Sequence, residues 1–267
     1  MLGAVVGDIV GSRFEHVNAR TRDFELFTDA CHFTDDTVHT LAVCRALVRC
    51  GFTRENLARE TVRQLSELSE AYSRLSYGAR FNLWRLQEEK LPYASCGNGA
   101  AMRVSGCALA ARTLEEALAL SDIVTGVTHS HPDGLRGARA VTETIFLARR
   151  GVDLSEVRRR IHENYYPMDF TLEDIRGDYC RGLRLNTCAN SVPQALQCFF
   201  EAHSLEDAVR NAVSIGGDSD TLAAIAGSAA AAAFGIPAEI AQQAANYLDA
   251  RLGSILEQFE AALGGER

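Results

Sequence analysis

The sequence predicts an all-α fold, and two patterns carry that prediction. Apolar residues recur at spacings of three and four through most of the chain, as on the buried face of a helix. Hydroxyl residues followed three positions later by an acid mark helix starts at Thr113, Thr171 and Ser204. The two-residue alternation with β-branched residues that is typical of strands is not found. We therefore expect a single domain over residues 1–267, a compact orthogonal bundle of roughly a dozen helices.

The expected helices follow in order along the chain. Residues 1–11 are apolar apart from Asp8 and have no basic flank, so we interpret them as a buried helix and not as a signal peptide. Periodic apolar residues predict further helices over residues 38–49, 54–72, 114–125, 134–150, 193–202 and 237–263. Pro193 and Pro237 are expected in the first turns of their helices, where a missing N–H is tolerated.

The alanine-rich segment 222–236 is the longest apolar stretch, and it is too short to span a bilayer with ease. It contains Gly227, Ser228, Ala229 and Ala230 in succession. Small side chains let helix axes approach closely, so we expect this helix at the centre of the bundle.

The composition narrows the possible function classes. The formal net charge is −8, which argues against a general nucleic-acid or membrane-surface binder because both need basic patches. The eight cysteines include no CxxC pair, which argues against a zinc cluster and favours buried reduced thiols. They are Cys31, Cys44, Cys50, Cys96, Cys107, Cys180, Cys188 and Cys198. With no targeting signal or membrane segment recognised, we expect a cytoplasmic protein.

Two acidic clusters are the foremost candidates for a functional site. Residues 33–37 read FTDDT directly before an apolar helix, and residues 215–221 read IGGDSDT at another helix start. One interpretation of each cluster is a helix N-cap, because helix N-termini favour acids. A cap needs only one acid, however, whereas the second cluster sets Asp218 and Asp220 after two glycines that permit a tight turn.

The pairing of the clusters points to metal ions. If the two helix N-termini converge, their four aspartates repel one another unless cations neutralise them. Hard divalent ions with oxygen ligands fit such a set, which predicts Mg²⁺, with Mn²⁺ as the alternative. Two such ions could bind a pair of substrate hydroxyls and activate a water molecule.

Two further segments carry polar side chains with two possible interpretations each. Residues 7–15 (GDIVGSRFE) end in Glu15, which is either solvated or an acid/base at the mouth of the site. Residues 128–132 (THSHP) carry His129 and His131, which either satisfy hydrogen bonds in the core or contact a ligand.

A glycine-containing loop is the fifth element. Residues 95–103 (SCGNGAAMR) place Gly97, Asn98 and Gly99 ahead of a helix. Such a loop is either a plain turn or a cradle whose N–H groups meet phosphate oxygens. It does not match the phosphate-loop or dinucleotide fingerprints.

These elements, in this order, resemble the ADP-ribosylglycohydrolase family. The resemblance rests on GDIVGSRFE, FTDDT, GNGAAMR, the TH of THSHP, SVPQAL and GGDSDT before an alanine-rich helix, and it spans residues 3–235. Its specificity lies in the joint order of the motifs, since each is common alone. The resemblance implies an all-α fold with a central binuclear magnesium cleft, in a hydrolase that acts on glycosyl bonds.

The resemblance also implies roles for individual residues. The implied metal ligands are Thr34, Asp35, Asp36, Asp218, Asp220 and Thr221. The implied catalytic residues are Glu15, Asp35, Asp36 and Asp220. ADP-ribose is expected to be held by Gly97, Asn98, Gly99, His129 and, by a looser transfer, His131. The segments between motifs are shorter than in many relatives, and these segments shape substrate choice.

The expected function is magnesium-dependent hydrolysis, by a monomer, of the N- or O-glycosidic bond between ADP-ribose and an acceptor. The acceptor is left open: arginine, serine, a nucleic-acid end or a small molecule. Three alternatives also stay open: another two-metal hydrolase of nucleotide substrates, a non-catalytic ADP-ribose-binding protein, and a crystallin-like structural protein. A structural protein has no reason to keep a cluster of mutually repelling acids, which argues against the last.

Overall fold

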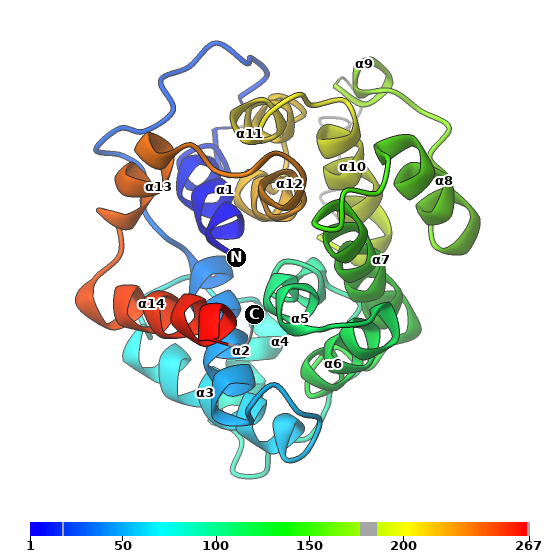
Figure 1. The fold of residues 1–267 in the computed structure, drawn as a ribbon. Coiled ribbons are helices and arrows are strands. Elements are labelled where there is room, and N and C mark those ends of the chain that lie inside the picture. The colour runs from blue at the N-terminus through cyan, green and yellow to red at the C-terminus, as the bar shows by residue number, and fades with distance from the viewer. Residues whose placement is uncertain (18, 177–185, 266–267) are drawn as a thin grey trace.

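The computed structural model describes residues 1–17, 19–176 and 186–265, and every regular element in these ranges is a helix (Figure 1). Fourteen α-helices and one short 3-10 turn, η1, make up the described chain. Its one β-type pairing is an isolated antiparallel bridge between Gly97 and Thr187. The predicted all-α fold is confirmed, with slightly more helices than expected.

The bounds of these elements are α1 Leu2–Ser12, α2 Asp35–Arg49, α3 Leu57–Ala71, α4 Ala79–Leu86, η1 Asn98–Ala100, α5 Ser105–Ala110, α6 Leu114–Gly126, α7 Pro132–Ala148, α8 Leu154–Asn164, α9 Leu172–Ile175, α10 Cys188–Phe200, α11 Leu205–Ser214, α12 Ser219–Phe234, α13 Ala238–Ala245 and α14 Ala250–Gly265.

Helices α1 and α12 lie side by side and form the most extensive helix pair of the fold (Figure 1). The three glycines of α1, Gly3, Gly7 and Gly11, face α12. A Cβ atom on Gly7 would lie 2.0 Å from the carbonyl oxygen of Ala223, so only glycine permits this approach. The residues of α12 from Ser219 to Ala230 are buried, which confirms the prediction of a small-residue helix at the centre.

The other helices surround this pair in two groups (Figure 1). Helices α7, α10 and α11 pack against α12, and most of the buried apolar side chains form one continuous core that extends from there over α1 to α2, α5 and α6. Helix α2 packs against α3, α5 and α14. A smaller apolar cluster lies beside α2 and includes Val38, Leu65, Trp84 and Leu252. Helix α2 thus connects the two groups, with its N-terminus near α1.

The predicted helix starts are confirmed at all three capping sequences. The Thr113 hydroxyl accepts a hydrogen bond from the backbone N–H of Glu116, and the Ser204 hydroxyl accepts one from that of Asp207. Thr171 forms a full capping box with Asp174. Each bond satisfies one of the donors that a helix leaves unpaired at its first turn.

Two predictions about helix bounds were wrong. Pro193 lies inside α10 and not in its first turn, because the helix begins earlier, at Cys188, through residues without apolar periodicity. The segment 237–263 is not one helix but two, α13 and α14. The chain turns between them, and Oδ1 of Asp249 accepts hydrogen bonds from the N–H groups of Arg251 and Leu252, both at 3.0 Å, so that it caps α14.

Within the described ranges, none of the helices is both long and apolar enough to cross a bilayer. The seven cysteines in these ranges are free, and five of them are buried. Cys180, the eighth cysteine of the sequence, lies outside the described residues.

Candidate active site

A cavity of about 560 Å³ opens where the N-termini of α2 and α12 meet the segments around residues 97 and 129. It brings together all of the predicted site residues except His131. These lining residues are Glu15, Thr34, Asp35, Asp36, Gly97, Asn98, Gly99, His129, Asp218, Asp220 and Thr221. The convergence of the two acidic clusters, on which the metal hypothesis depended, is therefore present in the fold.

The first acidic cluster forms the start of α2. Thr34 is the N-cap residue, and its hydroxyl accepts a hydrogen bond of 3.2 Å from the backbone N–H of Asp36. Asp35 and Asp36 occupy the first turn, where the helix dipole favours negative charge. Residues 34–36 therefore both cap the helix and line the cavity, so the two interpretations of this cluster are compatible.

A buried carboxylate that the site prediction omitted holds this turn in place. Oδ2 of Asp8 accepts hydrogen bonds from the backbone N–H groups of Thr34, at 2.9 Å, and Thr37, at 3.0 Å. Oδ1 accepts a third bond, of 2.6 Å, from the Thr34 hydroxyl. Asp8 is 0% exposed on α1. The signal available in the sequence was a single acid in an otherwise apolar helix, which needs buried partners.

The second acidic cluster forms the start of α12. Gly216 and Gly217 have φ of +75° and +86°, a conformation that favours glycine and that brings Asp218 to the N-cap position. Oδ2 of Asp218 accepts a hydrogen bond of 2.6 Å from Nδ2 of Asn98. Oδ1 of Asp220 accepts one of 2.9 Å from the backbone N–H of Thr221.

Burial and mutual repulsion raise the pKa values of the carboxyl groups. Burial, followed by the charges of Asp8 and Asp218, raises the pKa of Asp35 to about 8. Burial also raises the pKa of Asp36 well above its ordinary value, and the charge of Asp220 adds to the effect. The pKa of Asp220 is raised by burial and then by Asp218. Ionising all of these groups at neutral pH therefore requires compensating positive charge.

The donor set fits a hard divalent cation. Oδ2 of Asp36 is buried and makes no hydrogen bond, which is costly for a carboxylate oxygen unless a proton or a cation meets it. Carboxylate and hydroxyl oxygens are also the ligand types that Mg²⁺ and Mn²⁺ prefer. Within the described ranges, however, no three His, Cys, Asp or Glu side chains are grouped closely enough to hold a metal ion. The binuclear centre therefore stays a prediction.

The glycine-containing loop lies against the second acidic cluster. Besides Asp218, Nδ2 of Asn98 donates a hydrogen bond of 3.1 Å to the hydroxyl of Ser191 on α10. The bridge to Thr187 fixes the loop from the other side. A Cβ atom on Gly99 would lie 3.3 Å from Nε2 of His129, so this ring packs directly on the loop.

The remaining predicted residues differ in their placement. Glu15 lines the cavity and is half-buried beyond the end of α1. His131 lies elsewhere, as the N-cap of α7, and its Nδ1 accepts a hydrogen bond of 3.1 Å from the backbone N–H of Asp133. The HxH spacing therefore places only one histidine, His129, at the cavity, because the second is used to start a helix.

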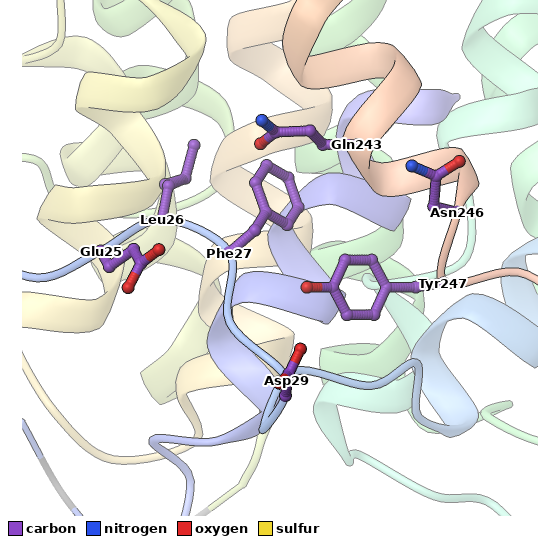
Figure 2. Close-up of a pocket in the computed structure, with 7 residues that line it drawn as sticks. All are labelled: Glu25, Leu26, Phe27, Asp29, Gln243, Asn246 and Tyr247. Carbon is purple, nitrogen blue, oxygen red and sulfur yellow. The ribbon is translucent and has the colours of Figure 1, made fainter.

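A second cavity, of about 450 Å³, lies between the segment after α1 and helix α13 (Figure 2). The rings of Phe27 and Tyr247 stack there with centroids 5.8 Å apart, and the Tyr247 hydroxyl donates to the carbonyl oxygen of Thr28. The carboxylates of Glu25 and Asp29 at its rim are exposed. None of the predicted site residues lines this depression, so the acidic cavity is the candidate active site.

Comparison with known proteins identifies the family of this chain. The sequence profile described as ADP-ribosylglycohydrolase matches residues 1–266. The chain belongs to the ADP-ribosylglycohydrolase family. It is 25% identical over 317 aligned residues to the protein named ADP-ribosylhydrolase ARH3 of Homo sapiens, covering 88% of this chain and 84% of that protein. Its identity to the Bos taurus protein of the same name is 24%, over the same shares of both.

The fold of this ADP-ribosylglycohydrolase family member also matches a solved structure. That structure is described as an ADP-ribosylglycohydrolase-related protein complex, and it superposes with a TM-score of 0.65. The match covers 98% of this chain and 93% of that chain at 22% sequence identity, so it shows a shared fold.

The cavity of this family member also contains residues that the site prediction did not name. Arg103, the last residue of GNGAAMR, is 1% exposed and lines it. His39, on α2, is buried against the rings of Tyr77 and Phe81 at centroid distances of 5.3 Å and 4.4 Å. Burial, followed by the charge of Arg103, lowers the pKa of His39 well below its ordinary value. The sequence did offer a signal for His39, since it lies one helical turn after Asp35 and Asp36 and so on the same face of the helix.

Proposed function

We propose that this chain is a magnesium-dependent ADP-ribosyl hydrolase that cleaves the glycosidic bond between ADP-ribose and an acceptor. The observation that carries the proposal is the meeting of both acidic helix N-termini with the 97–99 loop in one cavity. Membership of the ADP-ribosylglycohydrolase family supports it, as does the likeness to proteins named ADP-ribosylhydrolase.

The cavity is lined by groups of both charges, which suits ADP-ribose. Its lining includes Asp35, Asp36, Asp218 and Asp220, and also the buried Arg103, whose guanidinium contacts His129. A ligand with both a ribose diol and a diphosphate suits this combination, because the diphosphate is repelled by carboxylates and attracted by a cation. A substrate without an anionic group would gain nothing from the arginine.

The proposed metal ligands are Thr34, Asp35, Asp36, Asp218, Asp220 and Thr221. When bound there, Mg²⁺ supplies positive charge for the substrate hydroxyls and lowers the pKa of a coordinated water. Mn²⁺ is the alternative ion, since it shares the preference for oxygen ligands.

The chain's own groups have distinct tasks in this proposal. Glu15, at the mouth of the cavity, moves the proton between the water and the leaving group. The backbone of the 97–99 loop and the ring of His129 hold the diphosphate region in register. The carboxylate-rich end of the cavity stabilises the positive charge that develops on an oxocarbenium-like ribose.

The test is a panel of conjugates with metal titration. ADP-ribosyl-arginine, ADP-ribosyl-serine and ADP-ribosylated nucleic-acid ends are incubated with the protein beside plain phosphodiesters, with Mg²⁺, Mn²⁺ or chelator. We expect release of ADP-ribose from at least one conjugate, dependent on the metal, and loss of most of it in Asp220→Ala. Full magnesium-dependent hydrolysis by Asp220→Ala contradicts the metal assignment.

Calorimetry with ADP-ribose separates the non-catalytic alternatives. A binding protein takes up ADP-ribose yet releases nothing from any conjugate, and a structural protein does neither. A two-metal hydrolase of other nucleotide substrates cleaves the phosphodiesters and leaves the conjugates intact.

A further inference from the structure

Arg103 is a buried cation whose hydrogen bonds lead to a neighbouring ring and not to a carboxylate. Its Nη2 donates to the hydroxyl of Thr128 at 2.5 Å and to the carbonyl oxygen of Val124 at 3.4 Å. A third contact, of 3.4 Å, joins Nη2 to Nδ1 of His129. None of these three acceptors carries a negative charge. The positive charge of Arg103 therefore lies beside His129 and is not neutralised by these contacts.

These contacts determine which nitrogen of His129 carries the proton. Arginine has no acceptor atom, so Nδ1 must accept at its 3.4 Å contact with Nη2 of Arg103. The Thr128 hydroxyl accepts from Arg103 and therefore donates its own hydrogen to Nδ1, 2.8 Å away. Nδ1 therefore faces two donors and must be the unprotonated nitrogen. The proton of the neutral ring then lies on Nε2, the atom that packs on Gly97 and Gly99.

The ring also stays neutral. Burial lowers the pKa of His129 well below its ordinary value, and the charge of Arg103 lowers it further. A second proton would have to enter at Nδ1, where the guanidinium and the hydroxyl already point their hydrogens.

We propose that Arg103 and Thr128 are positioning residues that fix His129 as the Nε2–H tautomer, so that it donates to an anionic oxygen of the ligand. Arg103 thereby acts on the ligand through two intervening side chains. The identity of the ligand, ADP-ribose, rests on the proposed function, whereas the tautomer is a property of the free protein. The arrangement selects for a hydrogen-bond acceptor at this point of the cavity and rejects an amine or another donor.

The experiment measures the tautomer and the affinity separately in the full-length chain. Long-range ¹H–¹⁵N spectra of the free protein report which ring nitrogen is protonated, and the His129 signal is assigned by its loss in His129→Gln. ADP-ribose affinity is measured by calorimetry with Mg²⁺. The variants are Thr128→Val, which removes the hydroxyl at nearly constant volume, and Thr128→Ser, which keeps it.

We expect the native chain and Thr128→Ser to hold the proton on Nε2 and to bind ADP-ribose within about twofold of each other, because the hydroxyl is kept. Thr128→Val should show a mixture of tautomers and bind more weakly in proportion to the loss of the Nε2–H form measured in the spectra. Thr144→Val is the matched control, since it removes another buried hydroxyl, one that donates only to the carbonyl oxygen of Ala140. It should change neither measurement.

A proton on Nδ1 in the native chain, or an unchanged tautomer in Thr128→Val, overturns the inference. An equal loss of affinity in Thr144→Val also overturns it, because the effect is then one of packing. If ADP-ribose fails to bind the native chain, the proposed function is wrong, whereas the spectra of the free protein still decide the tautomer.

Discussion

Removal of the Asp8 carboxylate should unfold the first turn of α2 and cost a large part of the protein's stability. In Asp8→Ala, the N–H groups of Thr34 and Thr37 and the hydroxyl of Thr34 all lose their acceptor. A buried donor left without a partner costs about 1–3 kcal/mol. The hydroxyl can rotate, so the two backbone groups dominate and the total is about 2–6 kcal/mol. Whole domains are stable by only about 5–15 kcal/mol, so this variant should be marginal.

The matched variant is Asp8→Asn, which keeps the shape and removes the charge. Its carbonyl oxygen can take the place of Oδ2 and accept from both N–H groups, while its NH₂ donates to the Thr34 hydroxyl oxygen. It also removes one charge that raises the pKa of Asp36. We therefore expect a loss of within about 1 kcal/mol. Urea denaturation of the three proteins without metal gives the free energies of unfolding. An alanine variant that loses under about 1 kcal/mol, or an asparagine variant that loses as much as alanine, refutes the reasoning.

Three other perturbations have defined outcomes. Gly7→Ala puts a methyl group 2.0 Å from the carbonyl oxygen of Ala223 and should lower the free energy of unfolding by about 1–3 kcal/mol. The control Gly253→Ala, in open space on α14, should be neutral or stabilising. Equal effects of the two variants in denaturation would exclude a packing origin. Since the pKa of Asp35 rises from 3.8 to about 8, the folded chain keeps a proton that the unfolded chain releases, so without metal its melting temperature should fall as pH rises through this interval. At the proposed metal site Mg²⁺ should bind the ionised form and raise the melting temperature more at pH 8 than at pH 5; a pH-independent increment contradicts this. Glu15→Gln should lower turnover by about 10²–10⁴-fold with ADP-ribose affinity in calorimetry unchanged, and a loss of affinity alone would assign it to binding.

The sequence predicted those parts of the fold that depend on neighbouring residues. The capping residues Thr113, Thr171 and Ser204 start helices because the partner is an N–H group three positions along the same chain. The acidic clusters were also placed at helix starts for this reason, and the structure has Thr34 and Asp218 as N-cap residues.

The parts that the sequence did not predict depend on distant partners. Asp8 looks misplaced in an apolar helix until Thr34 and Thr37 fold back onto it. The role of Arg103 could not be predicted because its partner Thr128 is brought to it by α6 and the turn that follows. The prediction from Pro193 was wrong because it used only a local rule, the preference of proline for the first turn of a helix. In the structure α10 begins earlier, at Cys188, and packs on α12 with Pro193 inside it.

The bond between Asn98 and Asp218 joins residues 120 positions apart, and it has a consequence for the order of folding. Contacts of such separation form after local ones, because the loop between them must first be closed. The first acidic cluster can thus assemble with Asp8 early, while the repulsion among all the carboxylates arises only when α12 docks on α1 at the end. Under the proposed function, the active cavity is then complete only after α12 has docked on α1, so the fraction of active molecules in a preparation should measure how many have reached that step.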